Sequence, residues 1–277
     1  MRQRHCIAKH LSGVKGAFIN CSSSMHIQIV SIFPDIFKSF IETSLIKKAQ
    51  EKKIIKFTFV NPRIFCPGRH QQVDDTIYGW WAGLLMKAQP AIQAVESIIK
   101  KIKTKKTKGP LDKGGKQKGG FEKDFKIILL SPSKVTFTQK IAHSLSKEQH
   151  IIFVCTRYEG IDYRFEQYMK KKYPKQFQKI SIGQYITLGG EVPAMVMIEA
   201  VTRLISWVIK EEASRQDESY SVAQNMSNLE YPQYTKPEAV LNMKVPKILL
   251  SGHHANIKAR REKKTKSLAK KHIPCKK

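Results

Sequence analysis

The sequence lacks any apolar run that approaches the roughly 18 residues needed for a membrane-spanning helix. Its most apolar stretch, residues 193–209, is interrupted by Glu199 and Arg203. The five cysteines are scattered and none forms a Cys-x-x-Cys pair, which argues against a zinc ribbon or a redox motif. Their odd number argues against a complete disulfide framework and favours a reducing compartment, so we expect a cytoplasmic protein.

Several catalytic signatures are also missing. There is no Gly-x-Ser-x-Gly elbow, P-loop, His-Glu-x-x-His motif or Gly-x-Gly-x-x-Gly fingerprint, which argues against the enzyme classes that depend on them. Acidic residues are few: 22 Asp and Glu stand against 50 Lys and Arg, which leaves a net charge of +28. This excess indicates a polyanionic partner, either nucleic acid or an anionic membrane surface. A lysine-rich proteome would produce the same bias.

The chain does contain an alternation of apolar strands and helices. The pattern predicts strands over 25–33, 53–60, 126–133 and 150–155 and from 181 to a Gly-Gly turn, helices over 35–52, 90–103, 137–147 and from Pro193 onward, and a long loop over 63–87. Strands that alternate with helices predict an α/β fold with a largely parallel sheet flanked by helices.

Composition divides the chain into parts. Residues 1–24 form a basic extension that contains no acid, which a mis-assigned upstream start, our preferred interpretation, or a transit peptide would explain. Residues 25–209 form the main α/β domain, with a Lys-rich insertion at 100–126 that we expect to be flexible. A polar linker, 210–224, leads to a small helical domain, 225–277, with a very basic tail.

Three segments that follow predicted strands are candidates for ligand binding. They are 130–133, 156–162 and 181–194, and each comes directly after an apolar stretch. In a parallel sheet, ligands bind beyond the carboxyl ends of the strands. Glycines in two of these segments allow the backbone to approach a ligand closely, although any one of them could simply form a turn.

Six motifs in a fixed order resemble one family. They are RHQQVDD, LLSPS, RYEGID, SIGQYITLGGEVPAM, EYPQYTKP and VPKILLSGHHANI, between Met25 and about Arg261. Together they resemble the bacterial tRNA (guanine-N1)-methyltransferases, the TrmD family. The resemblance implies a SPOUT-class α/β sheet tied into a deep trefoil knot, which periodicity alone could not suggest because true knots are rare. It further implies a small helical C-terminal domain, a homodimer with shared active sites, and no membrane partner.

The resemblance also implies the reaction. S-adenosyl-L-methionine methylates N1 of the guanine 3′ of the anticodon, position 37 of tRNA, and Mg²⁺ is a further family expectation with no visible ligand set here. Backbone groups of the three post-strand segments do most of the cofactor recognition. Glu159 either meets the ribose or methionine amine or fills a structural, N-cap role. The cofactor residues that the resemblance assigns are Leu130, Ser131, Pro132, Thr156, Tyr158, Glu159, Gly160, Ile182, Gly183, Tyr185, Thr187, Gly189, Gly190 and Pro193.

Guanine N1 carries a proton at neutral pH, so a base must remove it as the methyl group transfers. A cation should stabilise the negative charge that develops on the exocyclic oxygen. The resemblance places the cation at Arg203, and an arginine on an otherwise apolar helix is costly unless it is paired or functional. It places the base, an aspartate in the family, at Glu218, with Asp217 as the alternative if the linker shifts by one residue.

The chain departs from the family near the substrate. The family's Pro-Tyr-Gly-Gly-Gly-Ala-Gly run is here residues 77–83, in which Trp80 and Trp81 replace glycines. These tryptophans could stack on tRNA bases or obstruct the target guanine. Thr156 replaces a glycine beside the cofactor, where its Cβ could crowd the adenosine, and Gln184 replaces an aspartate. One alternative is therefore a catalytically impaired RNA-binding relative. A second is a SPOUT enzyme with another target nucleotide, against which the family-specific motifs RHQQVDD and EYPQYTKP argue.

Electrostatics predicts where the RNA binds. Phosphate contacts supply affinity, so we expect the basic cluster of the C-terminal domain to meet the anticodon stem. His253 and His254 could suggest a metal pair, but the resemblance gives this place a helix-capping role, so we expect no metal there. The residues of the basic cluster are Lys258, Arg260, Arg261, Lys263 and Lys264.

Overall fold

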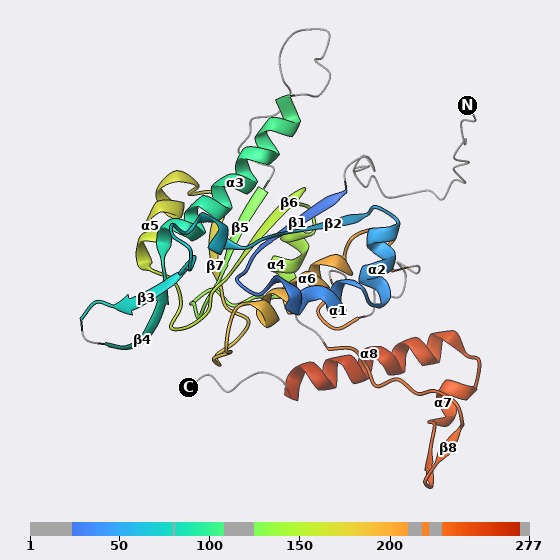
Figure 1. Cartoon of the computed structure of the whole chain (residues 1–277). Helices are drawn as coiled ribbons and strands as arrows, with labels where there is room; N and C mark the ends of the chain where they lie inside the picture. The colour runs from blue at the N-terminus through green and yellow to red at the C-terminus, as the bar shows by residue number, and fades with distance from the viewer. Residues whose placement is uncertain (1–23, 80, 108–124, 210–217, 222–228, 272–277) are drawn as a thin grey trace, which may run out of the picture.

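A computed structural model of the chain describes residues 24–79, 81–107, 125–209, 218–221 and 229–271. Its centre is a five-stranded sheet in the order β2-β1-β6-β5-β7, and every neighbouring pair is parallel (Figure 1). The strands are β1 (Met25–Val30), β2 (Ile55–Val60), β5 (Phe125–Leu130), β6 (His150–Cys155) and β7 (Phe177–Ile180). The predicted α/β fold with a largely parallel sheet is confirmed. Within the described ranges, no helix combines the length and hydropathy that crossing a membrane requires.

Side chains that alternate along the strands build two cores, one on each face of the sheet. On β6, Ile151 and Phe153 join one core while Ile152 and Val154 join the other. On β5, Ile128 and Leu130 face the first core and Ile127 and Leu129 the second. Both faces are therefore apolar, which explains why these strands read as continuous hydrophobic runs rather than as alternating patterns.

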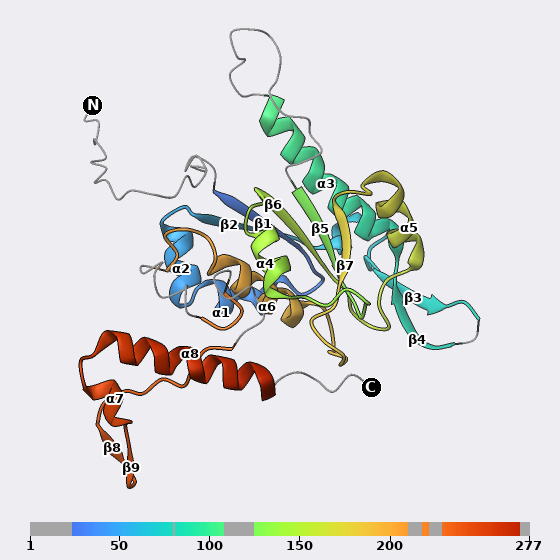
Figure 2. The same cartoon turned by 180° about the vertical axis from the view of Figure 1, so that it is seen from behind.

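Helices cover both faces, so the domain has three layers (Figures 1 and 2). One face carries α1 (Lys38–Ile41), α2 (Ser44–Glu51), α4 (Gln139–Leu145) and α6 (Glu191–Thr202). The other carries α3 (Ala88–Thr107) and α5 (Tyr163–Lys172), which pack against each other. This placement leaves the carboxyl ends of the strands open for the connecting segments.

The prediction of one continuous helix over 35–52 is wrong, because the chain forms separate helical pieces there. The chain forms a 3₁₀ turn, η1 (Pro34–Phe37), then α1, and after a break begins α2. Thr43 is extended at the break, and its hydroxyl donates to the carbonyl of Ser39. Ser44 follows with a φ of 51°, so the helical path cannot run through this point.

The loop predicted over 63–87 is also wrong, because it contains regular structure. After the 3₁₀ turn η2 (Pro62–Phe65), β3 (Asp74–Ile77) and β4 (Trp81–Met86) pair as an antiparallel hairpin. The hairpin extends from the carboxyl edge of the sheet in Figure 1. Its short strands and polar β3 gave no clear alternation in the sequence, so the pairing was not predicted.

The Lys-rich insertion begins later than predicted. Helix α3 continues to Thr107, and β5 begins at Phe125, so both ends of the range 100–126 are regular structure. Ile102 is 6 % exposed and packs in the second core, which explains why the helix extends into the lysines. Residues 108–124 lie outside the described residues, as does the extension 1–23.

The C-terminal part contains the predicted helices and an unpredicted hairpin. Strands β8 (Ala239–Val240) and β9 (Met243–Lys244) form the hairpin, and α7 (Lys247–Leu250) and α8 (His254–Lys271) follow it. Most of the predicted linker, 210–217 and 222–224, lies outside the described residues. The division into domains stays a prediction.

Trp207 is held in a left-handed conformation with a φ of 72° while its side chain is 70 % exposed. A bulky residue in this region is strained by about 1–2 kcal/mol, and exposure offers little packing in return. We expect Trp207→Gly to raise the melting temperature by about 2 °C, measured by calorimetry, since ~1 kcal/mol corresponds to 2–4 °C in chains of this size. Trp207→Ala keeps a Cβ and should give no such gain. An equal gain for both variants would show that exposure of the indole, and not the backbone, carries the cost.

Candidate active site

A cavity of about 190 Å³ lies beyond the carboxyl ends of β5, β6 and β7. The three segments predicted from the sequence converge on it, and thirteen of the fourteen predicted cofactor residues line it. Gly183 is the exception, while Ile180, Ser181 and Ile186 are lining residues that sequence reasoning missed. The predicted residues that line the cavity are Leu130, Ser131, Pro132, Thr156, Tyr158, Glu159, Gly160, Ile182, Tyr185, Thr187, Gly189, Gly190 and Pro193.

Hydrogen bonds tie the three segments together at the sheet edge. The amide of Gly190 donates to the carbonyl of Thr156 at 2.8 Å, which joins the third segment to the second. The hydroxyl of Thr156 donates to the carbonyl of Leu130 at 3.0 Å, which joins the second segment to the first. The family's glycine is thus replaced by a residue whose 9 % exposed side chain has a structural partner on β5.

Three glycines of the third segment are needed for close packing. A Cβ on Gly190 would lie 2.8 Å from the Cα of Cys155, and one on Gly189 would lie 2.4 Å from the Nε of Arg157. A Cβ on Gly183 would lie 2.3 Å from the ring of Tyr185. Gly183 therefore supports the cavity wall through Tyr185 without lining the cavity itself.

Glu159 lies on an exposed turn at the cavity, between Tyr158 with a φ of 58° and Gly160 with a φ of 118°. It does not cap a helix, because the N-cap of α5 is Asp162, whose side chain accepts from the amide of Arg164. The neighbouring Arg164 guanidinium lowers the pKa of the Asp162 carboxyl. The carboxylate of Glu159 is thus a cavity group, available to a ligand that carries a cation or hydroxyls.

The β3–β4 hairpin is joined directly to the second cavity segment. The amide of Glu159 donates to the carbonyl of Leu84 at 3.1 Å, and that of Met86 donates to the carbonyl of Gly160 at 3.1 Å. Gly83, with a φ of 109°, packs against Glu159, and a Cβ there would lie 2.9 Å from its Cγ. The hairpin that carries the departures at 80 and 81 is therefore fixed beside the cavity. Trp80 lies outside the described residues.

Arg203 and Glu218 form an ion pair. The Nη2 atom of Arg203 lies 2.6 Å from the Oε1 atom of Glu218, and the two side chains are 39 % and 25 % exposed. Arg203 caps the end of α6, and Glu218 reaches it from fifteen residues further along the chain. The two residues that the resemblance selected are thus brought together. Asp217 lies outside the described residues.

Helix α6 separates this ion pair from the cavity. Pro193 at the start of α6 lines the cavity, whereas Arg203 follows its last residue. Twelve helical residues span about 18 Å. Within one chain, the ion pair and the cavity therefore lie at opposite ends of the helix.

Buried thiols near the site are not nucleophiles. Cys155 ends β6 directly before the second segment and is fully buried. Burial, reinforced by the nearby Glu191, raises the pKa of its thiol well above the ordinary value. Cys66 is likewise buried, and burial raises its pKa. A protonated thiol packed in a core is a structural group.

The C-terminal part holds a larger cavity of about 1120 Å³, between residues 231–238 and helices α7 and α8. Its lining includes Arg260, Arg261 and Lys264, and the Arg261 guanidinium lies 4.7 Å from the centre of the Tyr231 ring. Lys258 and Lys263 lie on the same helix. Arginine stacked on an aromatic ring beside further cations suits an RNA backbone.

Metal ligands do not gather in the described part of the chain. No three His, Cys, Asp or Glu side chains come together there, and His253 and His254 are no exception. The described residues therefore offer no cluster of side chains that fits the Mg²⁺ that the resemblance implies.

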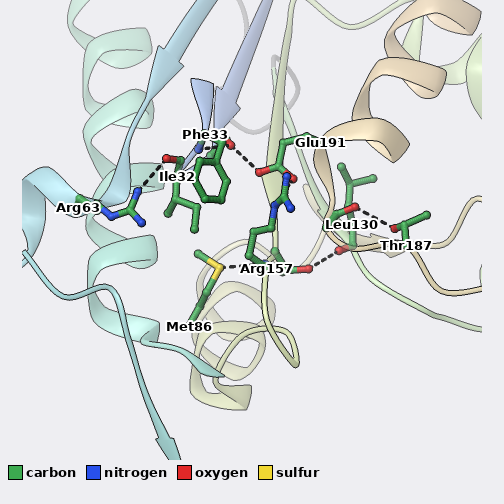
Figure 3. A network of polar contacts seen from close by, with 11 residues as sticks. Ile32, Phe33, Arg63, Met86, Leu130, Arg157, Thr187 and Glu191 are labelled. Atoms are coloured by element: carbon green, nitrogen blue, oxygen red, sulfur yellow. Dashed lines mark hydrogen bonds and ion pairs between the residues drawn. The ribbon is translucent and has the colours of Figure 1, made fainter. Parts of the chain in front are cut away.

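The network around Glu191 was also missed by sequence reasoning. Glu191 is fully buried and accepts hydrogen bonds from Ser31 and Arg157 (Figure 3). Its position directly after the Gly-Gly turn was the only hint in the sequence that Glu191 lies near the site. A glutamate in the first turn of a helix is usually solvated, so burial was not expected. Its distant partner Ser31, 160 residues away in sequence, could be identified only from the fold.

Comparison with known proteins supports the family resemblance over nearly the whole chain. The family described as tRNA (Guanine-1)-methyltransferase TrmD matches residues 25–274. A tRNA (guanine-N(1)-)-methyltransferase of Dictyoglomus turgidum is 40% identical over 86% of this chain and 84% of its own length. The proteins of the same name from Carboxydothermus hydrogenoformans and Geobacillus kaustophilus are each 40% identical over 87% of this chain, and 83% and 86% of their own lengths are covered.

Proposed function

The chain belongs to the tRNA (guanine-N1)-methyltransferase family and is an enzyme of that kind, and from this premise we propose how its residues divide the reaction. The cavity beyond β5–β7 holds S-adenosylmethionine, while Arg203 and Glu218 meet the guanine at position 37 of tRNA. The observation that carries the proposal is the 2.6 Å ion pair between these two side chains. We place the reaction in the cytoplasm, where a reducing environment suits the buried thiols of Cys66 and Cys155.

The cavity residues fit S-adenosylmethionine. Gly190 brings the backbone so close to Cys155 at the end of β6 that no Cβ is accommodated, and Gly189 packs against the side chains of Arg157 and Glu191. Backbone amides and carbonyls exposed at such a wall suit the polar edges of adenine and ribose. The Glu159 carboxylate provides a partner for a ribose hydroxyl or an ammonium group. When bound, S-adenosylmethionine supplies a methyl group activated by its positive sulfur.

Arg203 and Glu218 are complementary to the edge of guanine. Guanine presents an N1–H donor beside its O6 acceptor, and the pair offers a carboxylate acceptor beside guanidinium donors. Glu218 takes the N1 proton as the base, and Arg203 stabilises the charge that develops on O6. Adenine presents an acceptor at N1 and a donor at N6, so it would face both protein groups with the wrong partner.

In a homodimer with shared active sites, the cofactor cavity of one chain would face the Arg203–Glu218 pair of the other. The cavity and the ion pair of one chain lie at opposite ends of α6, so each is complete only beside the other half from a second chain. The cavity is also smaller than the ~300–1,000 Å³ usual for ligands of this size, which leaves part of the cofactor to be covered by a partner. Val192 and Val196 on α6 are 53 % and 46 % exposed, an apolar face suited to such a contact.

We extend the proposal to a trefoil knot. The chain leaves β7 at the edge of the sheet, passes the end of β5 and returns to pair with the residues after β6, where Gly190 bonds Thr156. On its way Ser181 exchanges backbone hydrogen bonds with Val135 and Phe137, which follow β5. Interlaced connections of this kind support a SPOUT-class fold.

Methyl transfer to an unmodified tRNA transcript tests the assignment. We expect label from S-adenosylmethionine to appear on a transcript with guanine at position 37 and at least ~100-fold more slowly on its adenine variant, because a mismatched hydrogen-bonding edge is rejected by that factor or more. Liquid chromatography of the digested RNA should identify 1-methylguanosine. Binding of cofactor and tRNA without transfer would favour the impaired relative. An intact Arg203–Glu218 pair argues against that alternative.

A further inference from the structure

A buried carboxylate outside the cavity connects segments that lie next to its walls. Glu191, the first residue of α6, is 0 % exposed, and its two oxygens have different partners. Oε1 accepts from the hydroxyl of Ser31 at 2.7 Å, and Oε2 accepts from the Nε of Arg157 at 2.8 Å. Ser31 follows β1 and Arg157 lies two residues after β6, so the side chain of Glu191 connects three separate segments.

Aromatic and backbone contacts extend this network. The guanidinium carbon of Arg157 lies 4.9 Å from the centre of the Phe33 ring, and that of Arg63 lies 5.6 Å from it. The hydroxyl of Ser31 also accepts from the amide of Phe33 at 3.0 Å. Met86 of the hairpin contacts the amide of Arg157 through its sulfur at 3.2 Å. The network therefore reaches the substrate hairpin as well as the cavity (Figure 3).

Neither Arg157 nor Glu191 lines the cavity, but residues beside them do. Thr156 and Tyr158 flank Arg157, and Gly190 precedes Glu191. A Cβ on Gly189 would meet both members of the ion pair, at 2.4 Å from Arg157 and 2.7 Å from Glu191. Both side chains of the ion pair thus pack against the backbone of Gly189 in the segment 187–190. Arg157 itself belongs to the facing segment, 156–160, so the pair lies between the two walls.

We propose that Glu191 is a positioning residue for the methyl donor: through Arg157 and Ser31 it fixes the spacing of the two cavity walls. This inference rests on the proposed function for the identity of the ligand. A buried ion pair adds little net stability compared with an apolar pair of the same volume, so its retention needs another reason. Here the reason is register: the bond between Gly190 and Thr156 joins the two segments at one point, and the directional Arg157–Glu191 pair adds a second point that an apolar contact would not provide.

Glu191→Gln tests the proposal, since it keeps the shape and one acceptor but removes the charge. Isothermal titration of S-adenosylhomocysteine into the full chain should show a dissociation constant raised by about 10- to 100-fold, as expected for walls displaced by a fraction of an ångström to 1 Å. The matched control is Glu166→Gln on α5. Glu166 is also buried, at 8 %, and pairs with Lys170 at 2.6 Å and with Lys179 of β7 at 3.3 Å. Neither Glu166 nor a residue next to it in the chain lines the cavity. Its variant should bind the probe as the unaltered protein does.

A milder variant covers the case in which Glu191→Gln fails to fold. Ser31→Ala removes one hydrogen bond to Oε1 and leaves the ion pair intact, so it should raise the dissociation constant about three- to tenfold. In steady-state assays both variants should raise the KM for S-adenosylmethionine more than the KM for tRNA, a split that a loss of folded protein would not produce.

Unchanged affinity in folded Glu191→Gln, or an equal loss in Glu166→Gln, would overturn the proposal. Because the titration needs no catalysis, its result is separate from that of the methyl-transfer assay. If the unaltered chain binds no S-adenosylhomocysteine, the proposed function itself fails, and that failure is distinguishable from a failure of the positioning role.

Discussion

Replacement of Glu218 by glutamine should lower the rate of methyl transfer by about 10²- to 10⁴-fold, the range that a general base contributes. The amide cannot take the N1 proton of guanine, but it has the same shape and can still accept a hydrogen bond from Arg203. Fold and tRNA binding should therefore change little. Single-turnover transfer at saturating cofactor and tRNA measures the effect directly, because it isolates the chemical step from product release.

Asp217→Asn is the matched control for this experiment, since it changes the adjacent carboxylate in the same way. Retained activity in Glu218→Gln together with loss in Asp217→Asn would mean that the linker presents the other carboxylate. Full activity in both variants would exclude this part of the linker as the source of the base.

Replacement of Arg203 should have an effect of similar size. Arg203→Met removes the guanidinium that stabilises charge on O6, and we expect the transfer rate to fall by about 10²- to 10³-fold, as for the loss of a single oxyanion donor. Arg203→Lys keeps a charge without the planar pair of donors and should recover only part of the rate. Equal activity in the methionine variant and the unaltered enzyme would reject the role.

Mixed dimers make this prediction more specific. One subunit carries Arg203→Met and the other carries Gly190→Ala, whose Cβ would lie 2.8 Å from backbone of Cys155 and displace the cavity wall. If each active site takes its cavity from one chain and Arg203 from the other, one of the two sites escapes both defects. The mixed dimer should then regain up to half of the normal rate, whereas neither parent dimer does.

The sequence predicted the elements that local chemistry determines. Continuous apolar runs such as His150–Cys155 correspond to a buried strand residue for residue, since a parallel sheet covered on both faces selects for them. The motif resemblance selected thirteen residues that line the cavity. It also selected Arg203 and Glu218, which are fifteen positions apart and form an ion pair in the structure. The three segments that follow strands could be predicted to meet at one site, because the carboxyl ends of parallel strands lie at the same edge of a sheet.

Features that depend on distant contacts were not predicted. The β3–β4 hairpin is fixed by backbone bonds to residues 159–162 rather than by its own pattern, so its sequence resembles a loop. The break at Thr43 is local, but it was missed because Thr43 and Ser44 leave the helical conformation within an otherwise helical stretch, which apolar periodicity does not reveal. Glu191 reads as an ordinary surface glutamate at a helix start until Ser31 and Arg157 are brought to it.

The position of the tryptophans has a spectroscopic consequence. The chain contains three: Trp80 and Trp81, of which Trp81 begins β4, and Trp207, which is exposed four residues beyond Arg203 in the segment that follows α6. Trp207, the one whose side chain the structure describes, belongs to neither core of the sheet. Emission from the exposed indole of Trp207 therefore reports on the segment that follows α6 and the Arg203 end of that helix. Under the proposed function, a change in this emission on addition of tRNA would follow docking without an added label.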